Sequence, residues 1–224
     1  MSIIAISRGS YSRGIEIAEK VAKKLNYQCL DRDLLIEASN EFDIPEVKLI
    51  QALEDPPSFF ERFTKMKKIY IDYIQAALIN NLKSDNIVYH GLAGHFFVKD
   101  IPHVLKVRII ADMEYRIKFV MERDKLTRNK AIEFLKKIDN SRREWGQHLY
   151  KLNIEDPIHY DIVINTEIMS SEVAANTICE MVTLEKFQTT PASQNKMDNL
   201  ASSLQNKIDK LPLSLKSTVS QKER

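Results

Sequence analysis

The residues best suited to chemistry lie near the N-terminus, in the segment Gly9-Ser10-Tyr11-Ser12-Arg13-Gly14. Its glycines have the G-x-x-x-x-G spacing of a phosphate-binding loop, and the segment separates a short apolar run from a helical pattern. In such a loop backbone N–H groups converge on an anion, and the N-terminus of the next helix adds a favourable dipole. The segment therefore predicts a phosphate site, with the glycines supplying backbone freedom.

The side chains that usually complete this motif are missing. Ile15 stands where a lysine would contact the phosphates, and Glu16 stands where Ser or Thr would bind magnesium. Spacing alone fits a phosphate cradle and an ordinary strand–helix turn equally. Arg8 and Arg13 favour the cradle, because a guanidinium can hold phosphate with two hydrogen bonds. The residues assigned to phosphate binding are Ser7, Arg8, Gly9, Ser10, Tyr11, Ser12, Arg13 and Gly14.

The composition excludes several other classes of protein. With 33 basic and 31 acidic residues the net charge is +2, too balanced for a protein that coats DNA or a polybasic membrane binder. No apolar run approaches the ~20 residues of a membrane helix, and the N-terminus does not resemble a signal peptide. Cys29 and Cys179 form neither a disulfide framework nor a metal cluster, and we expect both in the core. These features predict a cytoplasmic protein with no nucleic-acid or membrane partner and no protein-bound metal cluster.

Along the chain, short apolar runs alternate with segments whose apolar residues recur at helical spacing. This alternation favours a mainly parallel sheet covered by helices on both faces. Right-handed crossovers then bring the loops at the strand ends to one edge. We expect strands at residues 2–7, 28–30, 87–89, 104–111 and 161–165, and helices at 15–25, 32–41, 64–82, 112–124, 127–138 and 171–184.

The composition changes after residue 186, so we expect a domain at 1–186 and a polar tail at 187–224. The tail has six basic and three acidic residues. Its apolar residues fall at helical spacing; they are Met197, Leu200, Leu204, Ile208 and Leu211. The tail is thus either disordered with a marginal helix, or a helix that docks on a protein partner or a second copy of the chain.

Further segments follow the strands in a characteristic order. They are Asp31-Arg32-Asp33, Gly91, residues 111–116, residues 138–143 and residues 156–166. Over residues 2–185 this order resembles the cytidylate kinase-like family of P-loop proteins. The resemblance implies a three-layer α/β/α P-loop NTPase fold of the nucleoside monophosphate kinase type. It also implies transfer of the γ-phosphoryl group of ATP, with Mg²⁺, to a nucleoside monophosphate such as CMP or dCMP.

The resemblance also suggests roles for individual residues. Family loops of the form S-R-x-x-x-S-G-G also lack the lysine, and Ser7, Arg8, Ser12 and Gly14 match that form. By similarity, Asp31, Arg32 and Gly91 lie on the acceptor side, although Asp31 could equally cap a helix and Arg32 lie on the surface.

Three more residues match the part of the family that closes over the nucleotide. Arg116 would lie near this lid, unless it belongs to a solvated helix face. Asp139 and Arg142 resemble the lid's D-x-x-R pair, with Arg142 reaching the transferred phosphate and Asp139 orienting Arg142 or the metal. The same i, i+3 spacing also fits a surface ion pair. Weaker lid candidates are Arg123, Arg128 and Arg143.

One departure from the family pattern leaves the function open. The family often has Gly-Arg-Gly after the third strand, whereas this chain has Gly91-Leu92-Ala93. The strand also ends without an acidic residue that could hold a metal, and His90 and His95 are more typical of packing. An active kinase is therefore weighed against a nucleotide-binding sensor or partner protein without transfer activity, and against a P-loop domain with another role.

Overall fold

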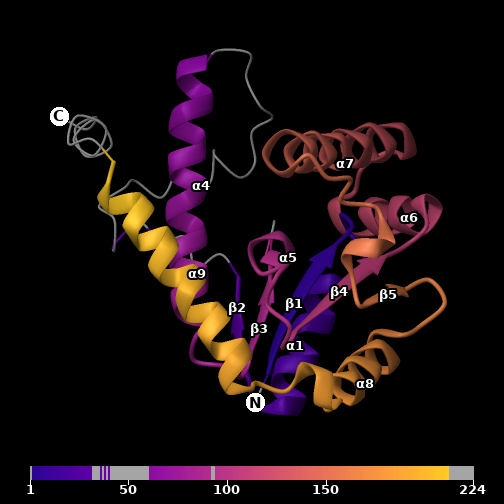
Figure 1. Cartoon of the computed structure of the whole chain (residues 1–224). Helices are drawn as coiled ribbons and strands as arrows, with labels where there is room; N and C mark the ends of the chain where they lie inside the picture. The colour runs from indigo at the N-terminus through magenta and orange to yellow at the C-terminus, as the bar shows by residue number, and fades with distance from the viewer. Residues whose placement is uncertain are drawn as a thin grey trace.

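The computed structural model describes residues 2–31, 36, 38, 40, 61–91 and 94–211. Within these residues five strands form one sheet in the order β2-β3-β1-β4-β5, with parallel pairing throughout (Figure 1). The strands are β1 (Ile3–Arg8), β2 (Gln28–Leu30), β3 (Ile87–His90), β4 (Val104–Ile110) and β5 (Ile162–Asn165). Because β1 lies between β3 and β4, the segment that follows β1 opens at the carboxyl edge of the sheet, beside the ends of both neighbours.

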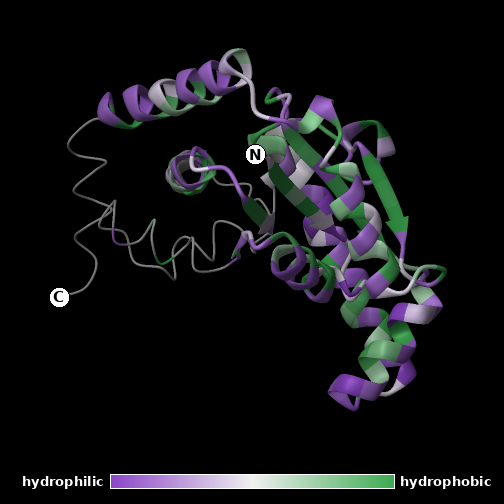
Figure 2. Cartoon of the chain, turned by 90° about the horizontal axis from the view of Figure 1, so that it is seen from below, coloured by the Kyte–Doolittle hydropathy of each residue, from purple (hydrophilic) through white to green (hydrophobic). Residues whose placement is uncertain are grey.

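Helices cover both faces of the sheet, as the alternation of patterns predicts. Ile4 and Ile6 of β1 face α1 (Gly14–Leu25) and α8 (Ser171–Met181). Ile3 and Ala5 face α4 (Glu61–Leu82), α5 (Gly94–Phe97) and α9 (Pro191–Asp209). Figure 2 shows strands that are mainly hydrophobic beside helices that mix hydrophilic and hydrophobic residues. The fold is therefore a three-layer α/β/α arrangement.

Two helices lie beyond the carboxyl edge of the sheet as a unit (Figure 1). They are α6 (Met113–Asp124) and α7 (Arg128–Tyr150). Asp112 caps α6, since its carboxylate accepts a 2.7 Å hydrogen bond from the Glu114 N–H. The pair has a small core of its own, formed by Ile117, Val120, Ala131 and Leu135. This core fixes the two helices together above the segment that follows β1.

The tail contains a packed helix. A capping box between Thr190 and Ser193 begins α9, and Met197 is fully buried against the face that α4 covers. Lys207 Nζ lies 2.6 Å from Asp72 Oδ1 of α4. Disorder, which the polar composition favours, is thus wrong for residues 191–209, because tertiary packing stabilises a helix that would be marginal alone. Residues 212–224 lie outside the described part of the chain, and association with a partner stays a prediction.

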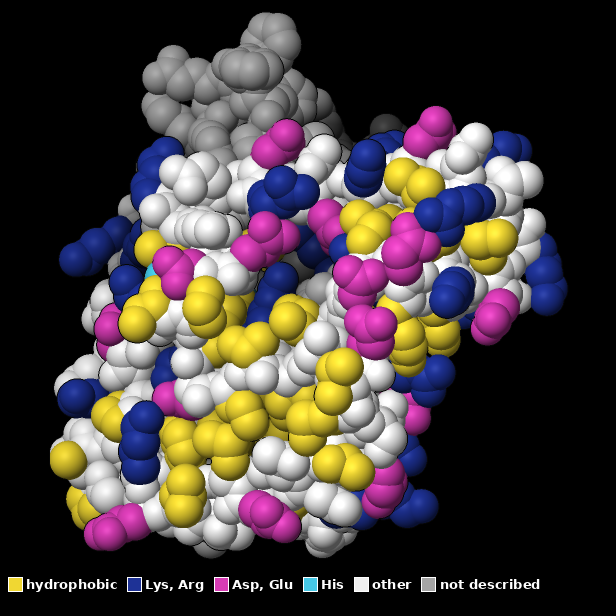
Figure 3. Space-filling model, turned by 90° about the vertical axis from the view of Figure 1, so that its right-hand side faces the viewer, with side chains coloured by type: hydrophobic (Ala, Val, Ile, Leu, Met, Phe, Trp, Pro, Cys, Tyr) yellow, Lys and Arg dark blue, Asp and Glu magenta, His cyan; other side chains and the backbone are white. Residues whose placement is uncertain are grey.

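The two cysteines lie at the margin of the core. Cys29 and Cys179 are free thiols that lie partly buried at its edge, so the expectation of core cysteines is wrong. Burial raises the pKa of Cys29 to about 11. Hydrophobic side chains gather on the face of the molecule seen in Figure 3. Among the exposed large hydrophobic residues are Val163 of β5 and Val173 of α8. In the described residues, no helix is both long and apolar enough to cross a membrane.

The two short 3₁₀ helices complete the path of the chain. The segment η1 (Pro157–His159) leads from α7 into β5, and η2 (Glu185–Phe187) leads from α8 toward α9. Asp156 caps η1 through the Ile158 N–H at 3.0 Å. This cap orders the segment before β5 and brings Tyr160 against the sheet beside α5.

Candidate active site

The loop after β1 takes its shape from residues other than its glycines. Tyr11 and Arg13 have left-handed backbone angles, with φ of 57° and 58°, whereas Gly9 and Gly14 do not have positive φ. The prediction that the glycines supply unusual angles is therefore wrong. Gly14 has a different function, because a Cβ there would lie 2.6 Å from the Arg8 Cβ. A Cβ at Gly9 would lie 3.6 Å from its nearest neighbour, which is ordinary contact.

Hydrogen bonds tie this loop to the ends of neighbouring strands. The Gly9 N–H donates to the Ile109 carbonyl at 2.8 Å, and the Ser12 hydroxyl donates to the Gly9 carbonyl at 2.9 Å. The Thr166 hydroxyl, just after β5, donates to the Ser12 carbonyl at 3.1 Å. The first turn of α1 then leaves its leading N–H groups without intrahelical acceptors. The result is a fixed loop with helix N–H groups available for an anion.

Ser10, Arg116 and Asp139 form a hydrogen-bonded group that joins the loop to α6 and α7. The Ser10 hydroxyl donates to Asp139 Oδ1 at 2.6 Å and accepts from Arg116 Nη1 at 2.9 Å. Arg116 Nη1 also lies 2.8 Å from Asp139 Oδ2, with both side chains nearly buried. Arg116 is therefore not on a solvated helix face. Asp139 forms its ion pair with Arg116, and its charge also acts on Arg142; that it orients Arg142 or a metal stays a prediction.

Arg142 of α7 reaches the loop itself. Its Nη1 donates to the Arg8 carbonyl at 3.0 Å, so a surface ion pair is excluded for this residue. Burial lowers the pKa of Arg142 to about 10, and the charges of Arg8, Arg108 and Arg116 act in the same direction. Asp139 opposes them. The buried Arg142 guanidinium therefore lies in the field of three other arginines, and the charge of Asp139 opposes their effect. Such a positive environment is suited to a polyanion.

Sequence reasoning missed Arg108. It lies within the apolar strand β4, is only 8% exposed, and donates from Nη1 to Ser7 Oγ at 2.9 Å. The Tyr160 hydroxyl lies 3.3 Å from the same Ser7 oxygen. The available signal was the pair of basic residues Lys106 and Arg108, two apart and hence on one face of a strand otherwise made of Val, Leu and Ile.

The other basic and aromatic side chains of the loop face α6 and α7. Tyr11 packs against Phe119 and Phe134, and the Arg123 guanidinium lies 4.5 Å from the Tyr11 ring centre. Arg13 lies over Phe119 at 5.6 Å and forms an ion pair with a neighbour on α1. The side chains of Tyr11 and Arg13 therefore fasten the loop to α6 and α7.

The weaker lid candidates lie outward. Arg128 forms a bidentate pair with Glu114 at 2.8 and 2.7 Å, where both side chains are about half exposed. Arg143 lies 3.6 Å from Glu155 in a similarly exposed pair. Both arginines are therefore held in solvated ion pairs at the surface.

Of the residues expected to meet the acceptor, Asp31 and Gly91 lie in the described part of the chain. Arg32, Leu92 and Ala93 lie outside the described residues, and Asp31 is exposed at the end of β2. Gly91 follows β3, where a Cβ would collide with the Tyr89 hydroxyl. His90 is buried at the end of β3, and its pKa is lowered by burial and by the charge of Arg8.

The donors near the loop do not form a magnesium cage. No group of three or more His, Cys, Asp or Glu side chains with metal-binding geometry occurs in the described residues. Ser12 donates its hydroxyl proton within the loop, and Asp139 holds Arg116 and Ser10. Magnesium often binds through substrate phosphates and few protein ligands, so these donors are compatible with an Mg²⁺ held mainly by phosphate oxygens.

A parallel sheet with this loop after its central strand and helices on both faces has the P-loop NTPase fold. The profile of the cytidylate kinase-like family matches residues 3–168, and the chain belongs to that family. The cytidylate kinase of Archaeoglobus fulgidus is 27% identical over 187 residues, which is 83% of this chain and 97% of that protein. Another from Sulfolobus acidocaldarius is 26% identical over 180 residues, covering 80% and 93%.

A third relative matches over a shorter stretch, and one solved structure shares the fold. The cytidylate kinase of Staphylothermus marinus is 32% identical over 102 residues, but the match spans only 46% of this chain and 56% of that protein. An uncharacterized protein from Eubacterium ventriosum has a TM-score of 0.61 at 21% identity, covering 82% of this chain and 99% of its own. That similarity shows the fold alone. Membership of this family supports a nucleotide-kinase activity.

Proposed function

We propose that the protein transfers the γ-phosphoryl group of ATP to a nucleoside monophosphate of the CMP or dCMP type. The main support is the concentration of arginines, namely Arg8, Arg108, Arg116 and Arg142, that act together beside the loop. Phosphoryl transfer depends mainly on positioning and charge stabilisation, which such a cluster can supply without a covalent intermediate on the protein.

In this mechanism the helix N–H groups after Gly14 and the Arg8 side chain hold the donor phosphates. An oxygen of the acceptor phosphate forms a bond to the γ-phosphorus, and the bond from that phosphorus to the β,γ-bridging oxygen breaks. ADP and a nucleoside diphosphate result. Arg142 would exchange its hydrogen bond to the Arg8 carbonyl for a bond to the transferred group. Mg²⁺ carried by the nucleotide would neutralise part of its charge.

The remaining residues have positioning or acceptor-side roles. Asp139 and Ser10 hold Arg116 toward the loop through the three short hydrogen bonds described above. Asp31, Arg32 and Gly91 would meet the acceptor at the ends of β2 and β3. The CMP-type acceptor is inferred from the relatives named cytidylate kinase.

A second candidate is nucleotide binding without transfer. It is favoured by the end of β3, where His90 stands instead of a carboxylate and Leu92 follows instead of an arginine. A sensor or regulatory partner protein would use the same loop and arginines to bind ATP and would give no product with any monophosphate.

The two candidates are separated by an ADP-release assay across the ribonucleoside and deoxyribonucleoside monophosphates, combined with Arg142→Ala. We expect turnover with CMP or dCMP, and a fall in kcat on the order of 10³-fold in Arg142→Ala, because transition-state charge loses its closest guanidinium. Arg143→Ala is the matched control, since Arg143 is its exposed neighbour on α7. Its kcat should stay close to that of the wild type.

Binding is measured in parallel by the shift in melting temperature with ATP, with and without Mg²⁺. A shift with ATP but no ADP release for any acceptor would support the sensor. Equal kcat for wild type and Arg142→Ala would contradict the proposed role of Arg142. The absence of any shift with ATP would contradict both candidates.

A further inference from the structure

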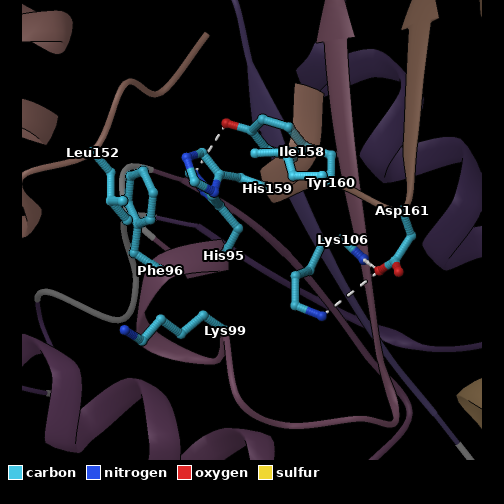
Figure 4. Close-up of a pocket in the computed structure, with 9 residues that line it drawn as sticks. All are labelled: His95, Phe96, Lys99, Lys106, Leu152, Ile158, His159, Tyr160 and Asp161. Carbon is cyan, nitrogen blue, oxygen red and sulfur yellow. Dashed lines mark hydrogen bonds and ion pairs between the residues drawn. The ribbon is translucent and has the colours of Figure 1, made fainter. Parts of the chain in front are cut away.

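A separate pocket of about 210 Å³ lies beside the candidate active site. Figure 4 shows its walls, which come from α5 and the residues after it, from β4, and from the segment before β5. The lining residues are His95, Phe96, Lys99, Lys106, Leu152, Ile158, His159, Tyr160 and Asp161. No residue of the loop at 9–14 lines it. The Tyr160 ring forms one wall, while its hydroxyl lies 3.0 Å from His95 Nε2 and 3.3 Å from Ser7 Oγ.

Lys106 has an incompletely satisfied ammonium group in this pocket. Its side chain is 14% exposed, and among the described residues its Nζ donates one hydrogen bond, to the Val104 carbonyl at 3.2 Å. Its ion-pair partner is Asp161, whose Oδ2 lies 3.7 Å from Nζ, too far for a short hydrogen bond. Burial lowers the pKa of Lys106, and the charge of Asp161 opposes this shift. A buried ammonium is unfavourable unless it is paired and hydrogen-bonded, so its remaining N–H donors point to an anionic ligand.

Asp161 is shared between Lys106 and two other donors. Its Oδ2 accepts the Lys106 backbone N–H at 2.9 Å, and its Oδ1 lies 2.9 Å from Lys186 Nζ. It therefore serves as a fixed structural acceptor at the edge of the pocket. The lysines and acids that line the pocket are Lys99, Lys106 and Asp161, and their formal charges sum to +1. His95 adds no charge near neutral pH, because burial first and the charge of Arg108 second lower its pKa to about 3.

The walls of the pocket indicate the chemistry of the uncharged part of the ligand. The rings of Phe96, His95 and Tyr160 offer flat apolar surface, and Leu152 and Ile158 complete it. The volume is below the range of about 300–1,000 Å³ typical of pockets for drug-sized ligands. We propose that this pocket binds a single-ring aromatic carboxylate, with the carboxylate on Lys106 and the ring among the aromatic side chains, at a site distinct from the phosphate loop.

Isothermal titration of the full chain with benzoate and nicotinate tests the proposal, with benzamide as the uncharged analogue. We expect millimolar or tighter binding of the carboxylates, and at least about tenfold weaker binding of benzamide. Lys106→Met keeps the length and apolar stem of the lysine and should weaken benzoate binding by about tenfold or more. Lys23→Met, which removes an exposed lysine of α1, is the control and should bind as the wild type does.

A second variant guards against a folding defect in Lys106→Met. Ile158 is 80% exposed at the rim, so Ile158→Trp should leave the fold intact while filling the pocket and abolishing benzoate binding. Arg142→Ala should keep benzoate binding, which separates this site from the phosphate site and from the fate of the proposed kinase function. Binding of neither carboxylate, equal binding by wild type and a folded Lys106→Met or Ile158→Trp, or displacement of benzoate by CMP or by inorganic phosphate would overturn the proposal.

Discussion

At Arg142 two unfavourable effects act on one side chain. The guanidinium is removed from water, and it lies in the field of three other arginines. A charge in this position is expensive unless an anion compensates it. The Arg8 carbonyl and the nearby Asp139 compensate only in part. In the proposed function, a bound polyphosphate would offset the mutual repulsion of these arginines, which would favour its binding.

Gly14 gives a test of the loop at single-residue resolution. A Cβ at this position would lie 2.6 Å from the Arg8 Cβ and 2.9 Å from its Cδ, so Gly14→Val must displace Arg8 or the start of α1. We expect ATP binding, measured by calorimetry, to weaken by about tenfold or more. Gly9→Ala is the control, because its added methyl has room and the position has no positive φ. An unchanged ATP affinity in Gly14→Val would refute the close packing as a requirement for binding.

Residue identities could be predicted where a local pattern carries them. The loop follows from motif spacing, whereas Arg116, Asp139 and Arg142 were singled out by the family resemblance. The pairing of Asp139 with Arg116 depends on how α7 crosses the loop, which no spacing along the chain encodes. Arg108 was hidden because an apolar strand context argued for a core residue, and only the register of β4 beside β1 brings it to Ser7.

At the scale of elements, α9 is a helix made stable by its neighbour. The strands were predictable to within one or two residues, because each is a short apolar run next to a turn. The same local information could not reveal that the apolar stripe of the tail packs against the layer formed by α4. Composition argued for disorder, and the decisive interaction is tertiary.

A substitution at Met197 tests how much the packing of α9 contributes to the free energy of unfolding. It is fully buried, so Met197→Ala should lower the free energy of unfolding by roughly 2–5 kcal/mol, as lost burial and a residual cavity add together. Chemical denaturation of the full chain gives the value. Lys196→Ala changes the exposed neighbour on the same helix and should stay within about 0.5 kcal/mol of the wild type. Equal stability of both variants would mean that α9 adds little to the fold.

At the scale of the whole molecule, buried histidines make stability depend on pH. The pKa values of His90, His95 and His103 are lowered chiefly by burial, that of His95 to about 3. Between that value and the ordinary 6.5, the unfolded chain binds a proton at position 95 that the folded chain does not. The stabilisation is therefore complete above pH 6.5 and is lost as the pH falls toward 3.

His95→Gln tests this linkage. One such histidine contributes a slope of about 1.4 kcal/mol per pH unit within that window, so the variant should lose stability less steeply on acidification by about this amount. Urea unfolding at a series of pH values from neutral to mildly acidic measures both slopes. Parallel curves for the wild type and His95→Gln would show that His95 titrates alike in the folded and unfolded chain.

The left-handed angles at Tyr11 and Arg13 bear on how such a loop could be engineered. A residue other than glycine in this region is disfavoured by about 1–2 kcal/mol. Here the contacts of Tyr11 with Phe134 of α7 and of Arg13 with Phe119 of α6 hold the loop in this conformation. The eight-residue stretch from Ser7 to Gly14 is consequently not a portable module. Grafted between a strand and a helix of another scaffold without α6 and α7, it would lose the contacts that hold its left-handed angles, and the N–H groups that we propose bind the donor phosphates would no longer converge.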